Sequence, residues 1–394
     1  AYAVVSYQTA WLKANHPVEF MAGVMNCDIH LTDKLAIYFE EVRKQLDLPW
    51  VPPCVNRSDA TFKVVDGALV YALGALKNVG VEAMRLVTDG RGDKPFATLF
   101  DLARRVDLKR VGKRPLEMLA RSGAFDQLDS NRRRVFNALD ALVNYSAAIH
   151  EQKSSSQVSL FGETGEDLPE PRLLPVDDWL PAERLGEEFK AVGFYLSGHP
   201  LDDYMGPLKR KGVLTLDELT EKAERAPLIG KLAGVVTGRQ ERKSARGNRF
   251  AFCQMSDTTG AFEVTLFAET LEKSREHLET GAKVVVTVEA TMEADQLKLL
   301  GRSVAPVDTV AADVGGMGLK VFINAPEAIA SVASVLEGAH QAAKNAGRGP
   351  VQFCLMDPEL PGEVEVDLGQ DFAVNPQIKG AIKSLQGVLE VEDI

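Results

Sequence analysis

The spacing of apolar residues changes several times along this chain, and each change marks a different kind of structure. Near the start, apolar residues recur at intervals of three or four, which is typical of a helix with one buried face. These residues are Leu35, Tyr38, Val42 and Leu46. Two short apolar runs then flank Asp66 and Gly67, a dipeptide that favours a β-hairpin. Residues 74–145 follow as short helical segments separated by glycine.

The second half of the chain is rich in strand patterns. Residues 228–308 contain five strand-like runs, with a short helical stretch between the third and the fourth that ends at Gly281. That order of elements is typical of an OB-fold barrel. Residues 318–394 then alternate between strands and helices, which indicates a small α/β domain.

These patterns predict a multidomain α+β protein. Between its two halves lies a stretch that is low in aliphatic residues and rich in Ser, Glu and Pro, so we expect a linker there. The expected order is a helical region at 1–60, a tandem helix-hairpin-helix module at 61–148, the linker at 149–185, a helical connector at 186–227, a five-stranded OB-fold β-barrel at 228–308 and the small α/β C-terminal domain at 318–394.

Composition narrows the class of protein. A chain of 394 residues is long enough for roughly two to four domains. A net charge of −11 argues against a uniformly basic nucleic-acid coat, although it does not exclude basic patches. No apolar run is long enough to span a bilayer, and the cysteines are too scattered for a disulfide framework or a zinc cluster. We therefore expect a cytoplasmic protein with reduced thiols and no membrane partner.

One group of residues could be imagined as a metal site. His199 lies close to Asp202 and Asp203 in the sequence. Their spacing matches no known ligand pattern, so the plainer interpretation is a polar turn around Pro200. We expect neither a metal site nor a cofactor in this chain.

The first candidate for nucleic-acid binding is a tight turn that leads directly into a helix. Its residues are Lys77, Asn78, Val79 and Gly80. Asn78 and Gly80 both tolerate positive φ, and the amides of such a turn, together with the helix N-terminus, form a site for one phosphate. The alternative is a glycine-containing turn that only packs two helices together.

A second and weaker copy of this turn follows further along the chain. It is centred on Gly112, with Lys113 and Arg114 beside it. Two such hairpins in tandem, the second of them strongly basic, favour a contact with the DNA backbone over simple packing of helices.

The strand-rich region has a basic first loop followed by alternating aromatic residues. The cations are Arg239, Arg242, Lys243, Arg246 and Arg249. Phe250 and Phe252 alternate on the next strand and therefore share one face. Cations that follow phosphates, beside rings that stack on bases, are what binding to a single strand requires. The two rings could equally fill the barrel core, and the sequence leaves both possibilities open.

An apolar pair inside the polar linker needs a separate explanation. The pair closes the string Gln157, Val158, Ser159, Leu160 and Phe161. Side chains in a flexible segment cannot form a core of that segment, so they either dock on a neighbouring domain or anchor in a pocket of a partner protein. We favour the partner protein.

Several strings of the chain resemble one family in their order and intervals. They include AYAVVSYQTAWLKANHPVEFMAGVMN, GALKNVG, LFDLARR, SGAFD, QVSLFG, EEFKAVGFYLSGHPLDDY and GNRFAFCQMSDTTGAFEVTLF. In these strings the chain is similar to the C-terminal part of the bacterial replicative DNA polymerase III alpha subunit, most clearly up to about residue 306. The chain also lacks a starting Met, and we expect it to be a segment of a longer protein.

The resemblance implies a role for each region. Residues 1–60 would be the end of the fingers domain, the hairpin module would hold duplex DNA, and the barrel would contact the single-stranded template. Gln157, Leu160 and Phe161 would anchor the chain to the beta sliding clamp. Residues 318–394 would bind the tau subunit of the clamp loader.

The resemblance also implies where the chemistry lies. In this family two metal ions, expected to be Mg²⁺, catalyse phosphoryl transfer on palm-domain aspartates that precede the fingers. We therefore expect no catalytic residue in this chain and no DNA synthesis by this chain alone. Two alternatives stay open: an error-prone paralogue of the same family, and a stand-alone repair or single-strand-binding protein that reuses these domains.

Overall fold

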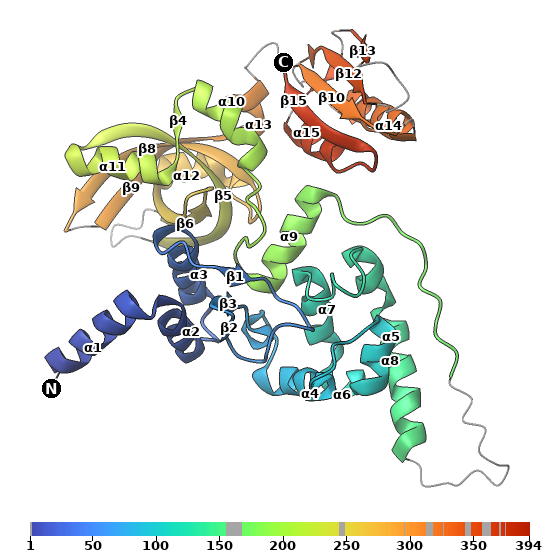
Figure 1. The fold of residues 1–394 in the computed structure, drawn as a ribbon. Coiled ribbons are helices and arrows are strands. Elements are labelled where there is room, and N and C mark those ends of the chain that lie inside the picture. The colour runs from blue at the N-terminus through green and yellow to red at the C-terminus, as the bar shows by residue number, and fades with distance from the viewer. Residues whose placement is uncertain are drawn as a thin grey trace, which may run out of the picture. The chain divides into compact units, whose positions relative to one another are not determined.

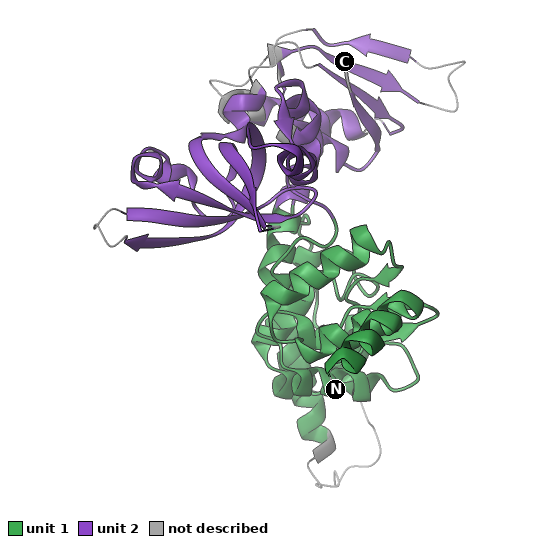
Figure 2. Ribbon diagram, turned by 90° about the vertical axis from the view of Figure 1, so that its left-hand side faces the viewer, with its two compact units in different colours: residues 1–179, 183–197 green, residues 180–182, 198–394 purple. Residues whose placement is uncertain are grey.

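The computed structural model divides the chain into two compact units. Unit 1 contains Ala1–Trp179 and Glu183–Ser197, and unit 2 contains Leu180–Ala182 and Gly198–Ile394, as Figure 2 shows by colour. The structure describes residues 2–154, 168–243, 249–294, 296–312, 318–325, 327–342, 348–356, 364–369, 372–374 and 376–394. Within these ranges, no helix is both long and apolar enough to cross a membrane.

Unit 1 consists mainly of helices (Figure 1). They are α1 (Tyr2–Asn15), α2 (Pro17–Cys27), α3 (Thr32–Glu40), the π-helix η1 (Glu41–Gln45), the 3-10 helix η2 (Leu73–Ala75), α4 (Val81–Arg91), α5 (Leu99–Arg105), α6 (Leu108–Val111), α7 (Lys113–Ser122), α8 (Arg132–Ser154) and α9 (Pro181–Val192). A small sheet contains β1 (Trp50–Val51), β2 (Lys63–Val65) and β3 (Ala68–Val70).

The small sheet of unit 1 contains the hairpin that the sequence predicts. Strand β3 pairs antiparallel with β2 and parallel with β1. Asp66 and Gly67 join β2 to β3 with φ of 51° and 76°. Positive φ at both central residues is what a type I′ turn requires, so the predicted hairpin is confirmed.

One hydrophobic core runs through unit 1 from α2 to α9. Leu35 and Val42 are completely buried in it, while Tyr38 and Leu46 pack partly against it, so the predicted apolar helix face is confirmed. Full burial of a side chain of this size contributes about 1.5–3 kcal/mol to stability. The helical region and the hairpin module, which the sequence separates into two domains, thus share one core.

Helices occupy both ends of the segment expected as a linker. Helix α8 continues to Ser154, and α9 begins at Pro181. Residues 168–179, which we call the strap, contribute Leu168 and Leu173 to the edge of the unit 1 core. Composition alone missed this packing, because two widely spaced leucines in a polar segment show no periodicity.

Unit 2 begins with a short connector and continues into a sheet-rich region (Figure 1). The connector contains η3 (Asp202–Tyr204), α10 (Met205–Arg210), β4 (Val213–Leu214) and α11 (Leu216–Arg225). The following elements are β5 (Leu228–Lys243), β6 (Arg249–Ser256), β7 (Ala261–Phe267), α12 (Ala268–Ser274), η4 (Arg275–His277), β8 (Lys283–Glu293), β9 (Gln296–Pro306) and α13 (Val307–Ala312).

The strands β5 to β9 close into a barrel. The sheet order is β4-β5-β6-β7-β9-β8, and an additional pairing of β5 with β8 closes the ring. Strands β7 and β9 run parallel, whereas the other neighbouring barrel strands are antiparallel. Helix α12 follows the third barrel strand and precedes the fourth, so the OB-fold order predicted from the sequence is confirmed.

The remainder of unit 2 is a small α/β fold, as predicted. Its elements are β10 (Leu319–Ile323), α14 (Glu327–Ala342), β11 (Arg348–Gly349), β12 (Val351–Leu355), β13 (Val364–Asp367), β14 (Phe372–Ala373), α15 (Pro376–Lys383) and β15 (Val388–Asp393). The main sheet has the order β13-β12-β10-β15, with β10 parallel to β12. Val332 of α14 and Ile382 of α15 are fully buried in the same core as Val321 of the sheet.

The glycines of the two predicted hairpins differ in conformation. Gly80 has φ −89° and ψ 143°, so it does not use the positive φ that the sequence suggests for it. Asn78 takes the left-handed conformation instead, with φ 59°. Gly112 has φ 93° and ψ 148°, a region restricted essentially to glycine. The second hairpin, unlike the first, therefore requires its glycine.

We predict that Gly112→Ala lowers the free energy of unfolding of unit 1 by about 1–3 kcal/mol, because alanine is strained at this φ and ψ. Gly80→Ala is the matched control, since no atom lies within 4 Å of the Cβ that it adds. Urea denaturation followed by tryptophan fluorescence reports on unit 1, because Trp11, Trp50 and Trp179 all belong to it. Equal denaturation midpoints for the two variants would contradict this assignment.

Candidate nucleic-acid interface

The first hairpin presents the N-terminus of α4. Gly80 is the N-cap and provides no side-chain cap. The amide of Met84 donates to the Gly80 carbonyl at 3.2 Å, so the amides of Val81 and Glu82 precede the first hydrogen bond of the helix. Amides in that position, together with the helix dipole, favour an anion. The carboxylate of Glu82 opposes this effect, but it pairs with Arg85 at 2.7 Å.

Helix α9 holds the lysine of the first hairpin in place. The amide of Lys77 donates to the carbonyl of Ala191 at 2.7 Å. Its Nζ lies 5.4 Å from the ring centroid of Phe189, within the range of a cation–π contact. The ammonium group of Lys77 is therefore held beside the turn, half-buried and supported by an aromatic ring.

The second hairpin is built on a buried hydroxyl and a capping carboxylate. The Oγ of Ser146 in α8 accepts from the amide of Leu108 at 3.1 Å and donates to the carbonyl of Val106 at 2.9 Å. Asp107 caps α6 by accepting from the amides of Lys109 and Arg110 at 3.1 and 3.3 Å. These bonds fix the direction in which α6 enters the turn at Gly112.

Helix α7 leaves that turn with a cationic first turn. Gly112 is the N-cap of α7 and has no side chain to cap it. The amides of Lys113 and Arg114, at the start of the helix, therefore lack a capping side chain. Arg114 is exposed. Lys113 is also exposed but pairs with Asp140 of α8 at 2.7 Å, and this hydrogen bond raises the pKa of Lys113 above its ordinary value. The structure thus brings the three predicted residues together, with one cation already paired.

Two further cations of the second hairpin were not among the DNA-binding residues predicted from the sequence. Lys109 and Arg110 in α6 are exposed and immediately precede the turn. Lys109 lies 3.7 Å from Glu151 of α8. The short basic run that contains them was visible in the sequence, but its helical placement beside Gly112 was not.

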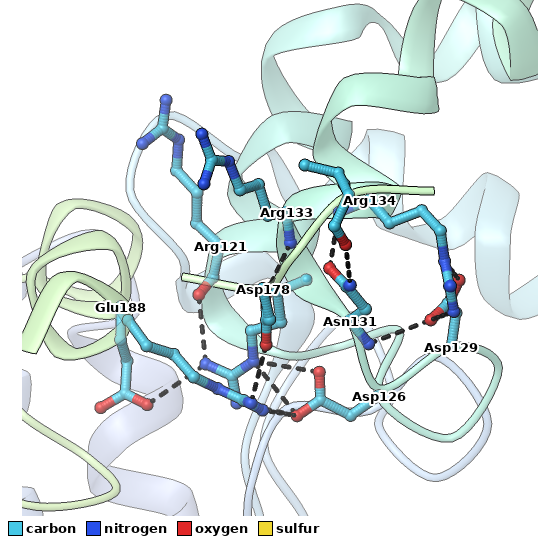
Figure 3. A network of polar contacts seen from close by, with 11 residues as sticks. Arg121, Asp126, Asp129, Asn131, Arg133, Arg134, Asp178 and Glu188 are labelled. Atoms are coloured by element: carbon cyan, nitrogen blue, oxygen red, sulfur yellow. Dashed lines mark hydrogen bonds and ion pairs between the residues drawn. The ribbon is translucent and has the colours of Figure 1, made fainter. Parts of the chain in front are cut away.

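A network of ion pairs around Asp126 joins the hairpin module to the strap and α9 (Figure 3). The carboxylate of Asp126 accepts from Arg132 Nε at 3.0 Å and from Arg184 Nη2 at 3.1 Å. Arg184 Nη1 also donates to Asp178 of the strap at 3.0 Å. The Arg132 side chain is largely buried, with Glu188 of α9 at 3.7 Å on its other side.

The strap makes further contacts with the same helices. Asn131 Nδ2 donates to the carbonyl of Val176 at 2.6 Å, and the amide of Arg133 donates to Asp178 at 3.0 Å. The ring of Trp179 packs 5.7 Å from that of Phe136 in α8. The strap is therefore docked on unit 1 rather than extended into solvent.

The predicted clamp-binding string lies outside the described residues. Its members are Gln157, Val158, Ser159, Leu160 and Phe161. The described chain ends before the string at Ser154 and resumes after it at Leu168, and both of these flanks belong to unit 1. The string is thus attached to unit 1 at both of its ends.

The barrel excludes one of the two interpretations of Phe250 and Phe252, namely that they fill its core. Ala251, Cys253 and Met255 alternate with them along β6 and are completely buried in the barrel core. Phe250 and Phe252 are only half-buried and are not part of that core, so they project from the outer face. Their rings lie 5.4 Å apart at an interplanar angle of 83°.

The predicted cations of the barrel lie along the β5–β6 hairpin. The guanidinium carbon of Arg242 lies 5.4 Å from the ring centroid of Phe252, and Lys243 pairs across the strands with Arg249. Arg239 instead donates to the carbonyl of Arg275 at 3.1 Å. Arg246 lies outside the described residues.

His199 and Asp202, the residues considered for a metal site, form hydrogen bonds within a polar turn. The two ring nitrogens of His199 contact the Oγ of Ser256 at 3.1 Å and the amide of Leu201 at 3.2 Å. Asp202 accepts from the amide of His199 at 2.6 Å. Over the ranges that the structure describes, no group of three or more His, Cys, Asp or Glu residues is arranged to hold a metal ion.

Two known protein families match parts of the chain. The family described as helix-hairpin-helix motif matches residues 48–135, which contain both hairpins. The family described as OB-fold nucleic acid binding domain matches residues 231–306, which correspond to the barrel. Together they confirm the predicted fold class and indicate binding to nucleic acid.

Individual relatives match the whole chain. It is 39% identical to the DNA polymerase III subunit alpha of Caulobacter vibrioides, with 100% of this chain and 34% of that protein covered. The corresponding protein of Vibrio cholerae is 31% identical, with the same coverage of 100% and 34%. A solved structure of a mitochondrial single-stranded DNA-binding protein from S. cerevisiae is similar with a TM-score of 0.18 and 19% identity, over 20% of this chain and 95% of that one.

The chain spans about a third of the length of these polymerase relatives. Their similarity extends over all of its regions, from the helices of unit 1 to the small α/β fold. The chain therefore belongs to the family of DNA polymerase III alpha subunits.

Proposed function

We propose that this chain holds DNA and the sliding clamp for a replicative DNA polymerase and has no catalytic residue of its own. The second hairpin supports the DNA contact most strongly. There the glycine-only conformation of Gly112 directs the N-terminal amides of α7 between exposed cations. Amides and cations that converge in this way suit a backbone phosphate, whose charge they neutralise.

The two hairpins are proposed to bind duplex DNA as a pair. They share one hydrophobic core, so the distance between their helix N-termini is fixed. Backbone amides and cations contact phosphates without reading bases, which suits a protein that must move along any sequence. The first hairpin has fewer free charges than the second, because Lys77 is held over Phe189.

The outer face of the barrel is proposed to contact the single-stranded template. Its half-buried rings, Phe250 and Phe252, lie beside the cations of the β5–β6 hairpin. Rings that stack on bases and cations that follow the backbone are the combination that binds single strands without sequence preference.

The clamp contact is assigned to Gln157, Leu160 and Phe161. Two adjacent apolar side chains in a short polar segment suit a pocket on a partner protein. Attachment at both ends to unit 1 supports the assignment, because the string is then carried by the same body as the hairpins. A second attachment of this kind raises the effective concentration of the polymerase at the DNA.

Membership of the family extends the proposal to the whole protein. We propose template-directed DNA synthesis as its activity, with Mg²⁺ bound in a palm domain. The small α/β fold at residues 318–394 is proposed to contact the tau subunit of the clamp loader.

Replacement of Lys113 and Arg114 by alanine is predicted to weaken binding to duplex DNA. Each phosphate contact that is lost should reduce the slope of log affinity against log salt by about 0.9. Fluorescence anisotropy over a series of KCl concentrations measures both quantities. Arg114→Ala alone should account for most of the change, because Lys113 is already paired with Asp140.

Arg225→Ala is the control for this experiment, since it removes an exposed cation of α11, outside both hairpins. It should change neither the affinity nor the slope. If the double variant also keeps the parent slope, the second hairpin only packs helices and the proposed phosphate site does not exist.

Leu160→Ala combined with Phe161→Ala is predicted to weaken clamp binding by about 30-fold or more, the effect of losing a hot-spot side chain. Surface plasmon resonance with immobilised clamp measures it, and duplex affinity should stay unchanged. Leu174→Ala is the matched control, because this strap leucine is 78% exposed and lies outside the string. Clamp affinity equal to that of the parent chain would refute the assignment.

A further inference from the structure

The outer face of the barrel carries an aromatic residue that the proposed function does not yet use. Phe267 ends strand β7, and its side chain is 57% exposed. In the register of β6 and β7 it stands directly opposite Phe250. Paired residues of antiparallel strands project from the same face of a sheet, so Phe267 shares the outer face with Phe250 and Phe252.

The other two rings of this face are already engaged. Phe250 and Phe252 pack edge to face, with their centroids 5.4 Å apart, and both are half-buried. The guanidinium group of Arg242 lies over the ring of Phe252. Of the three rings, Phe267 therefore has the most area that a base could cover.

We infer that Phe267 is the principal stacking ring of this face, and that Phe250 and Phe252 support it and hold Arg242 toward a phosphate. The inference rests on the proposed contact between the barrel and a single strand. It names the ligand chemistry more closely: an unpaired, unstacked base of a single-stranded nucleic acid.

Stacking on Phe267 favours a single strand over a duplex. A base that stacks on a protein ring must leave the stack of its neighbouring bases, which a base-paired duplex resists. Glu263 lies two residues before Thr265 on β7. Its carboxylate should repel the phosphate backbone of the nucleic acid and so keep the bound single strand near the cationic end of the face.

The test is a titration of the full chain with a fluorescent oligo(dT). Phe267→Ala should bind about 5- to 150-fold more weakly, the range expected for the loss of one base–aromatic stack. Phe267→Leu, which keeps an apolar side chain but no ring, should lose the same affinity. Phe267→Trp should keep it, and the added tryptophan fluorescence should be quenched by the oligonucleotide.

Ile229→Ala is the matched control, because Ile229 is 58% exposed on β5 of the same barrel. It should leave the affinity unchanged. The inference is overturned if Phe267→Ala binds oligo(dT) like the parent chain. If Phe250→Ala or Phe252→Ala then binds more weakly, single-strand binding by the barrel still stands. It is also overturned if the Leu and Trp variants bind alike. Failure of the parent chain to bind oligo(dT) would instead remove the proposed single-strand function itself.

Discussion

The carboxylate of Asp126 links the hairpin module of unit 1 to α9 and, through Arg184, to the strap. It accepts hydrogen bonds from Arg132 at the start of α8 and from Arg184 in α9, and Arg184 in turn bonds Asp178 of the strap. Asp126 thus joins the start of α8 to α9, whose Arg184 lies 58 residues further along the chain, and Arg184 extends the network to the strap. Charge-assisted bonds of this kind are directional and strong, and partial burial protects them from the screening that weakens exposed ion pairs.

Because of this network, the proposed contacts with duplex DNA and with the clamp belong to the same body. Helix α9 supports the first hairpin through the amide and the ammonium group of Lys77. The strap, which follows the clamp-binding string, is fixed to the helix that also pairs with Lys113 of the second hairpin. A duplex on the hairpins and a clamp on the string would therefore both be bound through unit 1, and the barrel would add a separate contact to the single strand.

Features set by neighbouring residues could be predicted from the sequence, and features set by distant ones could not. The hairpin at Asp66-Gly67 and the order of the barrel strands follow from turn chemistry and alternation, which are local. The pairing of Lys113 with Asp140 joins two helices and left no local signal. Phe267 could have been found, since the alternation of AFEVTLF places it on the outer face with Thr265. The clamp-binding residues remain a prediction from their motif.

The claim that one body carries both the duplex site and the clamp-binding string is tested most directly by binding to a primed DNA that carries a loaded sliding clamp. Affinity for this complex should be compared with affinity for the same DNA alone and for the clamp alone. We predict that the complex binds about 10²- to 10⁴-fold more tightly than either component, because the second contact becomes intramolecular. An affinity no greater than that for the tighter single component would contradict the claim.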